Sequence, residues 1–190
     1  MKHYLLALIT ISSLLQLNAQ TTTQVIPYAN DSRVITTAVP FLLIASDARA
    51  AGMGDMGVAT SPDAYSQQWN PAKYGFSEAK SGIGVSYTPY LSKLVNDIFL
   101  GNLTYFNRIN ERSAFAASFK YFSLGEIEIV QDEFSEALIE QPNELTIDAS
   151  YTLRLADQFA MAVGLRYLRS DLRIQAVDAN ASAASTFGVD

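Results

Sequence analysis

From Gly82 onward, apolar and polar residues alternate with a period of two, which is the pattern of β-strands. We expect strands at Gly82–Tyr90, Asp97–Asn107, Arg112–Phe122, Glu144–Leu155 and Phe159–Arg169, with a sixth beginning near Ser185. These lengths of about nine to eleven residues match tilted transmembrane strands better than the usual five or six residues of soluble sheets. The pattern therefore predicts an all-β fold of antiparallel strands long enough to cross a membrane.

One face of each predicted strand is apolar and uncharged, and the other mixes Gly, Ala and Ser with Lys, Asp and Arg. Transmembrane strands place lipid on the apolar side and a polar lumen on the other. Aromatic residues toward the strand ends would form a loose interfacial girdle (Tyr87, Tyr105, Tyr121 and Tyr167). A soluble exported sandwich would alternate in the same way with its apolar face inward, so alternation alone leaves the faces open. Strand length and the uncharged faces favour the membrane.

Short and long connections alternate between the predicted strands. Asn107–Glu111 and Ala156–Gln158 are short, whereas Leu91–Asn96, Ser123–Asn143 and Ser170–Ala183 are mostly longer. Outer-membrane barrels have short periplasmic turns and long outer loops, so we expect the longer connections to face outward. Ser123–Asn143 would then be an acidic surface loop whose start, at Glu126–Val130, extends the strand.

The short Ala156–Gln158 turn also predicts a register. If Leu155 pairs with Phe159, Asp148 lies directly opposite Arg166 on the polar face. We therefore expect a lumenal, structural ion pair between Asp148 and Arg166.

The chain before the strands divides into three parts. Residues 1–19 have a basic start, an apolar run and a small residue at Ala19, which is typical of a secretory signal peptide. Residues 20–38 are rich in Thr, Gln and Asn and are expected to form a mobile N-terminus. Residues 39–76 are rich in small residues and glycine with no steady period, and residues 82–190 carry the strands.

Composition restricts the chemistry that this chain can perform. The sequence has no cysteine, and its one histidine, His3, lies in the predicted signal peptide. Nucleophile–base triads and transition-metal sites are therefore not expected, and neither is a cofactor. The acidic loop lacks the Asp-x-Asp-x-Asp-Gly spacing of a calcium site. The formal net charge of −6 argues against a nucleic-acid partner.

Gly52-Met53-Gly54-Asp55-Met56-Gly57 matches the G-x-G-x-x-G pattern of dinucleotide-binding loops. That motif needs a strand before it and a helix after it, but Ser61-Pro62-Asp63 interrupts the would-be helix. A glycine-packed backbone segment is the better interpretation.

The same region carries a family resemblance. Residues 48–59 read A-R-A-A-G-M-G-D-M-G-V-A, and residues 63–72 read D-A-Y-S-Q-Q-W-N-P-A. Together with residues 38–47, they resemble the N-terminal signature of FadL-like outer-membrane barrels, and within them the PorV/PorQ family of the type IX secretion system. The signature residues of interest are Arg49, Gly52, Gly54, Gly57, Trp69, Asn70 and Pro71. In the strand region the resemblance is one of pattern only.

The resemblance implies a fold and a function. Residues 39–76 would form a plug-like segment in the lumen of an antiparallel transmembrane β-barrel of about fourteen strands, of which this chain holds the first five or six. It also implies a non-enzymatic outer-membrane protein that binds the C-terminal signal domain of secreted cargo. Such a protein works with a large outer-membrane translocon and with surface attachment proteins. A FadL-type transporter of hydrophobic small molecules is the alternative, and an outer-membrane lipase is disfavoured by the missing histidine.

Overall fold

The structure is a computed structural model that describes residues 39–95, 97–130, 138–173 and 182–190. These residues belong to one compact unit, Thr37–Asp190. The predicted signal peptide, residues 1–19, and the predicted mobile N-terminus, residues 20–38, lie outside the described residues. Parts of two long connections, residues 131–137 and 174–181, also lie outside them.

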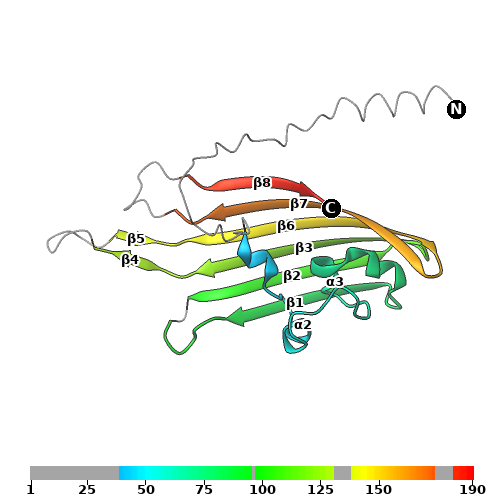
Figure 1. Ribbon diagram of the computed structural model, residues 1–190, viewed down its shortest axis with the longest axis horizontal. Helices are drawn as coiled ribbons and strands as arrows, with labels where there is room; N and C mark the ends of the chain where they lie inside the picture. Colours follow the sequence, from blue (N-terminus) through cyan, green and yellow to red (C-terminus); the bar gives the residue numbers. More distant parts are fainter. Residues whose placement is uncertain (1–38, 96, 131–137, 174–181) are drawn as a thin grey trace, which may run out of the picture. The chain divides into compact units, whose positions relative to one another are not determined.

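Six antiparallel strands form one open sheet in the order β1-β2-β3-β6-β7-β8 (Figure 1). Their bounds are Ser81–Pro89 (β1), Ile98–Arg108 (β2), Ser113–Leu124 (β3), Asn143–Ala156 (β6), Phe159–Asp171 (β7) and Ala184–Val189 (β8). The prediction of an all-β fold with antiparallel strands is confirmed, because each strand that the period-two pattern predicted is present in this sheet. We call the end that bears the short β2–β3 and β6–β7 connections the turn end, and the opposite end the loop end.

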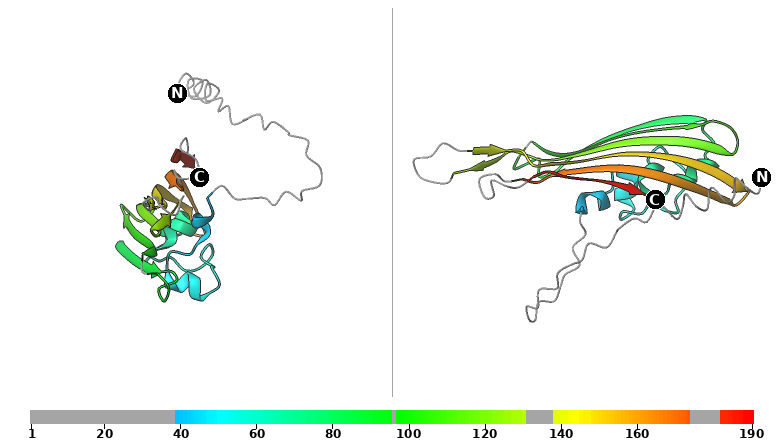
Figure 2. Two further views of the ribbon diagram at one scale, coloured as in Figure 1. Left: turned by 90° about the vertical axis from the view of Figure 1, so that its left-hand side faces the viewer. Right: turned by 90° about the horizontal axis from the view of Figure 1, so that it is seen from above.

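A separate two-stranded sheet follows β3 at the loop end, formed by β4 (Ile127–Ile129) and β5 (Leu138–Glu140). The sequence predicted that Glu126–Val130 simply extends the preceding strand. Instead β3 ends at Leu124, and Gly125, whose φ of +83° favours glycine, separates it from β4. An added Cβ there would lie 2.8 Å from Asp97 Oδ2, which also accepts a hydrogen bond from Glu126 N. The hairpin is therefore an independent extension beyond the main sheet, as Figure 2 shows.

The polar face of the sheet is buried and the apolar face is exposed. Thr146 and Thr152 are 0% and 1% exposed, whereas Val85 and Val163 are 70% and 54% exposed. The prediction that the apolar face carries no charge is wrong at its loop end. There Arg169 and Asp171 continue the outward-facing positions of β7, because the strand runs past the apolar band.

Four short helical elements precede β1 and lie on the polar face of the sheet (Figure 2). They are η1 (Pro40–Leu43), α2 (Ala48–Gly52), α3 (Ser66–Trp69) and η2 (Pro71–Phe76). We call residues 39–76, which hold all four, the N-terminal segment. Within the described ranges, no helix is both long and apolar enough to span a bilayer.

Two apolar clusters join the N-terminal segment to the sheet. Near the loop end, Phe41 packs with Leu100 and Leu168. Near the turn end, Tyr74 packs with Phe106 and with alanines of β3. The N-terminal segment therefore runs from the loop end of the polar face to its turn end before β1 begins.

Candidate functional site

Side chains on the polar face of the sheet hold the N-terminal segment mainly by donating hydrogen bonds to the backbone carbonyls of that segment. Thr104 Oγ1 donates a 2.7 Å hydrogen bond to Ala64 O, and Thr152 Oγ1 donates a 2.8 Å hydrogen bond to Pro71 O. Lys120 Nζ donates to Ile44 O at 3.3 Å, and Ser86 Oγ donates to Ser46 O. Buried irregular backbone must find hydrogen-bond partners outside regular secondary structure. The hydroxyl-rich face of the sheet supplies these donors.

Side chains of the N-terminal segment reach back toward the strands. Gln67 is buried, and its Oε1 accepts a 2.5 Å hydrogen bond from Ser150 Oγ. The Tyr74 ring stacks on Phe106 with the ring centroids 4.7 Å apart. The Tyr74 hydroxyl donates to Ala64 O at 3.0 Å and accepts from Gln67 N at 2.8 Å. Burial raises the pKa of Tyr74, so this hydroxyl stays protonated at pH values where an exposed tyrosine would lose its proton.

The glycine-rich motif ends a helix instead of opening one. Gly54, with a φ of +76°, follows α2, and its N–H donates to Ala51 O at 3.1 Å. The next residue, Asp55, donates its N–H to Ala50 O at 2.9 Å. Together these two bonds form a Schellman C-cap, which favours glycine at this position. A phosphate-binding loop would need its helix after the glycines, so the structure does not support a dinucleotide site.

Close glycine packing, which the sequence suggested for the whole motif, holds only at Gly57. A Cβ at Gly57 would lie 2.3 Å from the Trp69 ring, whereas nothing lies within 4 Å of the same position on Gly52 or Gly54. Trp69 therefore packs inside the segment, on the backbone of residue 57. Its Nε1 is buried without a hydrogen-bond acceptor among the described residues.

Lys73 and the Asn70-Pro71 turn complete the local structure. Lys73 Nζ donates to Gly57 O at 2.8 Å and to Thr60 Oγ1 at 3.1 Å. Burial lowers the pKa of Lys73, and the neighbouring charge of Asp63 opposes that change. Asn70 Oδ1 accepts a 3.1 Å hydrogen bond from Ala72 N and caps η2, whose first residue is Pro71. Sequence reasoning missed Lys73, because no motif marks a lysine that binds backbone.

Arg49 links the two halves of the signature. Its Nη1 lies 3.0 Å from Asp63 Oδ2, and its Nη2 donates to Ser61 Oγ at 2.9 Å. Because Arg49 is half-exposed, this pair is worth at most about 1 kcal/mol, and its role is to hold the loop geometry.

A layer of charged and polar side chains lies between the two apolar clusters. Asp148 is directly opposite Arg166, whose Nε donates to Asp148 Oδ1. Asp148 Oδ2 also accepts from Ser118 Oγ at 3.1 Å and from Thr146 Oγ1 at 3.3 Å. The two residues thus lie as the sequence register placed them, although that register is locally broken. Ala156, not Leu155, pairs with Phe159, because a bulge between Arg154 and Ala156 adds one residue.

The exposed face carries aromatic groups toward both ends. Near the loop end, Phe99 lies between Tyr87 and Tyr121, with centroid distances of 5.2 and 5.9 Å. Nearer the turn end, Tyr105 and Phe115 have centroids 5.9 Å apart. The row between them mixes aliphatic side chains, such as Leu103 and Ile147, with the aromatic residues Phe119, Tyr167 and Phe187. Aromatic residues therefore occur across this face, and the interfacial girdle expected from the sequence stays a prediction.

The β4–β5 hairpin is apolar and acidic at once. Apolar side chains are exposed on it or beside it, at Ile127, Val130, Leu138 and Ile139. Three glutamates, Glu126, Glu128 and Glu140, lie among them, and we call these the hairpin glutamates. The described part of the hairpin thus presents a mixed apolar and acidic surface at the loop end.

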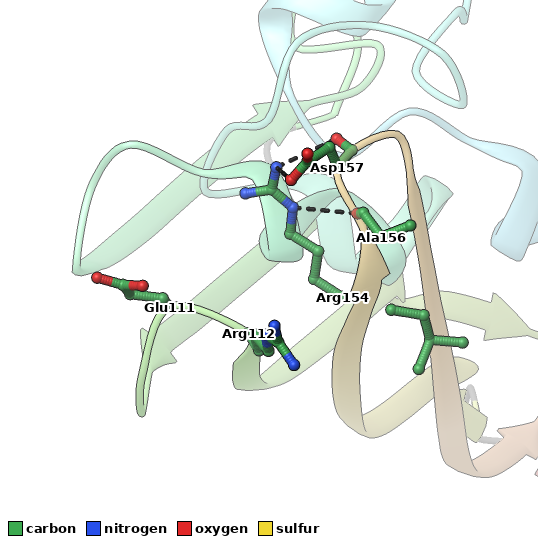
Figure 3. Close-up of a pocket in the computed structure, with 6 residues that line it drawn as sticks. Glu111, Arg112, Arg154, Ala156 and Asp157 are labelled. Carbon is green, nitrogen blue, oxygen red and sulfur yellow. Dashed lines mark hydrogen bonds and ion pairs between the residues drawn. The ribbon is translucent and has the colours of Figure 1, made fainter.

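A shallow pocket of about 190 Å³ lies at the turn end (Figure 3). Arg154 spans it and donates to Ala156 O at 3.3 Å and to Asp157 O at 3.1 Å. Its guanidinium carbon also lies 5.2 Å from the centroid of the Phe76 ring. Arg154 therefore fastens the β6–β7 turn to η2.

These features define a class of protein. It is all-β and antiparallel, with an exposed apolar sheet face and a polar face covered by an N-terminal segment. The chain belongs to the family described as type IX secretion system protein PorV, which matches residues 27–190. It is therefore a component of that secretion system. A search of curated proteins finds no match. The FadL-type transporter alternative gains no support from these comparisons.

Proposed function

We propose that the protein is a non-enzymatic outer-membrane β-barrel that binds the C-terminal signal domain of secreted cargo and carries it from the translocon to the attachment complex. The observation that carries the membrane assignment is the inverted sheet, polar where it is buried and apolar where it is exposed. The cargo step follows from the family and from the surface at the loop end. The proposal includes export by the signal peptide, residues 1–19.

The energetic cost of the exposed face supports the membrane assignment. Large apolar side chains are exposed in every strand of the main sheet, including Ile83, Leu103, Phe119, Ile147, Val163 and Phe187. Transfer of one such side chain out of water is worth about 1.5–3 kcal/mol. A soluble sandwich would cover this face, whereas in lipid the face needs no cover. In lipid this sheet would belong to a closed barrel, because open edges leave backbone groups unpaired, and the resemblance to FadL-like barrels implies about fourteen strands.

The contacts on the polar face support a plug role for the N-terminal segment. Its backbone carbonyls are bound by side chains of β1, β2, β3 and β6, at Ser86, Thr104, Lys120 and Thr152. Apolar clusters hold it at both ends. If the sheet closes into a barrel, residues 39–76 would lie in the lumen, with the Asp148–Arg166 pair beside them. Diffusion through such a lumen would be obstructed.

The β4–β5 hairpin is the best local candidate for the cargo contact. It lies at the loop end, which we place outside the cell because the short turns lie at the other end. Its exposed isoleucines and leucine offer apolar contacts, and the hairpin glutamates offer charge selection. The partners we expect are the large outer-membrane translocon protein, the cargo signal domains, the surface attachment proteins and the lipid bilayer.

Purification of the full-length protein from outer membranes tests the proposal. We expect co-purification of a very large barrel protein and of proteins that share a C-terminal domain. Bound fatty or aromatic molecules without protein partners would contradict the cargo role. Recovery of the mature protein from the periplasm without detergent would contradict the membrane assignment.

A further inference from the structure

A small cavity of about 40 Å³ lies inside the charged layer. Asn102 and Lys120 face each other across β2 and β3, and Asp148 faces Arg166 across β6 and β7. The N-terminal segment contributes Leu42 and Gln68 to the wall. The cavity is thus enclosed jointly by the sheet and the segment.

The carboxylate of Asp148 and the amide oxygen of Gln68, two acceptors that line this cavity, already receive hydrogen bonds. Asp148 receives hydrogen bonds from Arg166, Ser118 and Thr146. Gln68 Oε1 accepts from the backbone N–H and the hydroxyl of Ser46. These bonds engage the one carboxylate and the Gln68 amide oxygen that line the cavity.

The donors around the cavity are in excess. Lys120 is 4% exposed, and within the described ranges its Nζ bonds only to Ile44 O, which uses one of its three hydrogens. Asn102 is 5% exposed, and its Nδ2 has no acceptor among the described residues. Two cationic side chains, Lys120 and Arg166, line the cavity with one carboxylate. The second carboxylate near Arg166, at Asp190, is 4.0 Å from Nη1 and mostly exposed.

We propose that this cavity binds a monoatomic anion, chloride being the abundant one, held by Lys120, Asn102 Nδ2 and Arg166. One water needs about 10–15 Å³ of such a volume, so the cavity suits one ion with one or two waters. Because Lys120 and Arg166 share one carboxylate, the anion would balance the remaining positive charge, whose burial is costly without a partner. Because both the sheet and the segment line the cavity, the anion would also hold the N-terminal segment in place.

Bromide diffraction tests the site directly. Crystals of the full-length protein grown in bromide should show an anomalous peak between Lys120 and Asn102. A water without anomalous signal, or a carboxylate from elsewhere in the full chain, would overturn the proposal. This measurement needs no variant and does not depend on the proposed cargo role.

Hydrogen–deuterium exchange of the N-terminal segment gives a second test. If an amide of the segment exchanges only when the segment opens and releases the anion, chloride should slow that exchange. The factor is one plus the ratio of the free chloride concentration to the dissociation constant of chloride. This factor is about tenfold at nine times that constant, against gluconate at equal ionic strength. Asn102→Asp supplies a fixed carboxylate opposite Lys120, so we expect exchange that no longer depends on chloride.

Asn107→Asp is the matched control, because it makes the same change on the same strand outside the cavity. It should keep the full chloride dependence. Chloride-independent exchange in the wild-type protein, or equal dependence in the Asn102 and Asn107 variants, would refute the anion site.

Discussion

The Asp148–Arg166 pair allows a quantitative test of the buried charged layer. Asp148→Asn keeps the size of the side chain but removes the charge that compensates Arg166. The Asp148 side chain is 11% exposed and accepts from three side chains, so the loss is not readily replaced by water. Removing one partner of a buried pair costs about 3–5 kcal/mol. Because the Arg166 side chain is 29% exposed and partly screened, we expect about 3 kcal/mol.

Urea unfolding of the full-length protein from detergent micelles measures this cost by linear extrapolation. Asp157→Asn is the matched control. It removes the acid of the Arg154–Asp157 pair, whose carboxylate is fully exposed, and should leave the unfolding free energy unchanged. Arg166→Met and the double variant complete a cycle, for which we expect a coupling of about 1–3 kcal/mol.

Two outcomes of these measurements would contradict the buried ion pair. An Asp148→Asn cost below about 1 kcal/mol would mean that the carboxylate is solvated in the complete protein. Additive effects of the two single variants would mean that the ion pair contributes nothing beyond its separate hydrogen bonds. Either result would refute the claim that Asp148 and Arg166 form a buried and energetically coupled ion pair.

Three further predictions concern the signature, its tyrosine and the hairpin. Gly57→Ala should destabilise the protein by about 1–3 kcal/mol, because the new methyl overlaps the Trp69 ring; Gly52→Ala, which meets nothing, should not, and equal urea midpoints would refute the packing. The pKa of Tyr74 is raised in the folded state, so above about pH 10 only the unfolded state releases this proton, and the free energy of unfolding should fall as pH rises. Tyr74→Phe should flatten that fall in urea titrations at alkaline pH. Replacing the hairpin glutamates by lysine should reduce cargo capture in pull-downs at least several-fold while Glu111→Lys at the turn end leaves it unchanged, and equal capture by both variants would exclude the hairpin.

Much of the sheet could be read from local pattern. Strand side chains alternate between two faces, so apolar residues at every second position mark a strand wherever it later packs. Gly125 shows the limit of this pattern. The alternation continues past it into residues 126–130, but the positive φ and the contact with Asp97 turn the chain into a separate hairpin. That contact joins positions 29 residues apart, which a local pattern does not encode.

Part of the candidate site could likewise be predicted from the sequence, and part could not. The Asp148–Arg166 contact follows from counting residues across a short turn, and it survives the bulge at Leu155 because the extra residue is absorbed before the turn. The roles of Lys73, Gln67 and Asn102 could not be predicted. Each depends on backbone or on side chains that only the folded segment brings together.

By itself, the sequence determined the strands and the family, because these depend on local periodicity and on a local motif. Only the tertiary structure decided which face of the sheet is covered. Contacts between positions 40 to 83 residues apart, such as Thr104 to Ala64 and Ser150 to Gln67, bury the polar face and leave the apolar face exposed. Alternation is symmetric between the two faces, so burial had to come from packing across the chain.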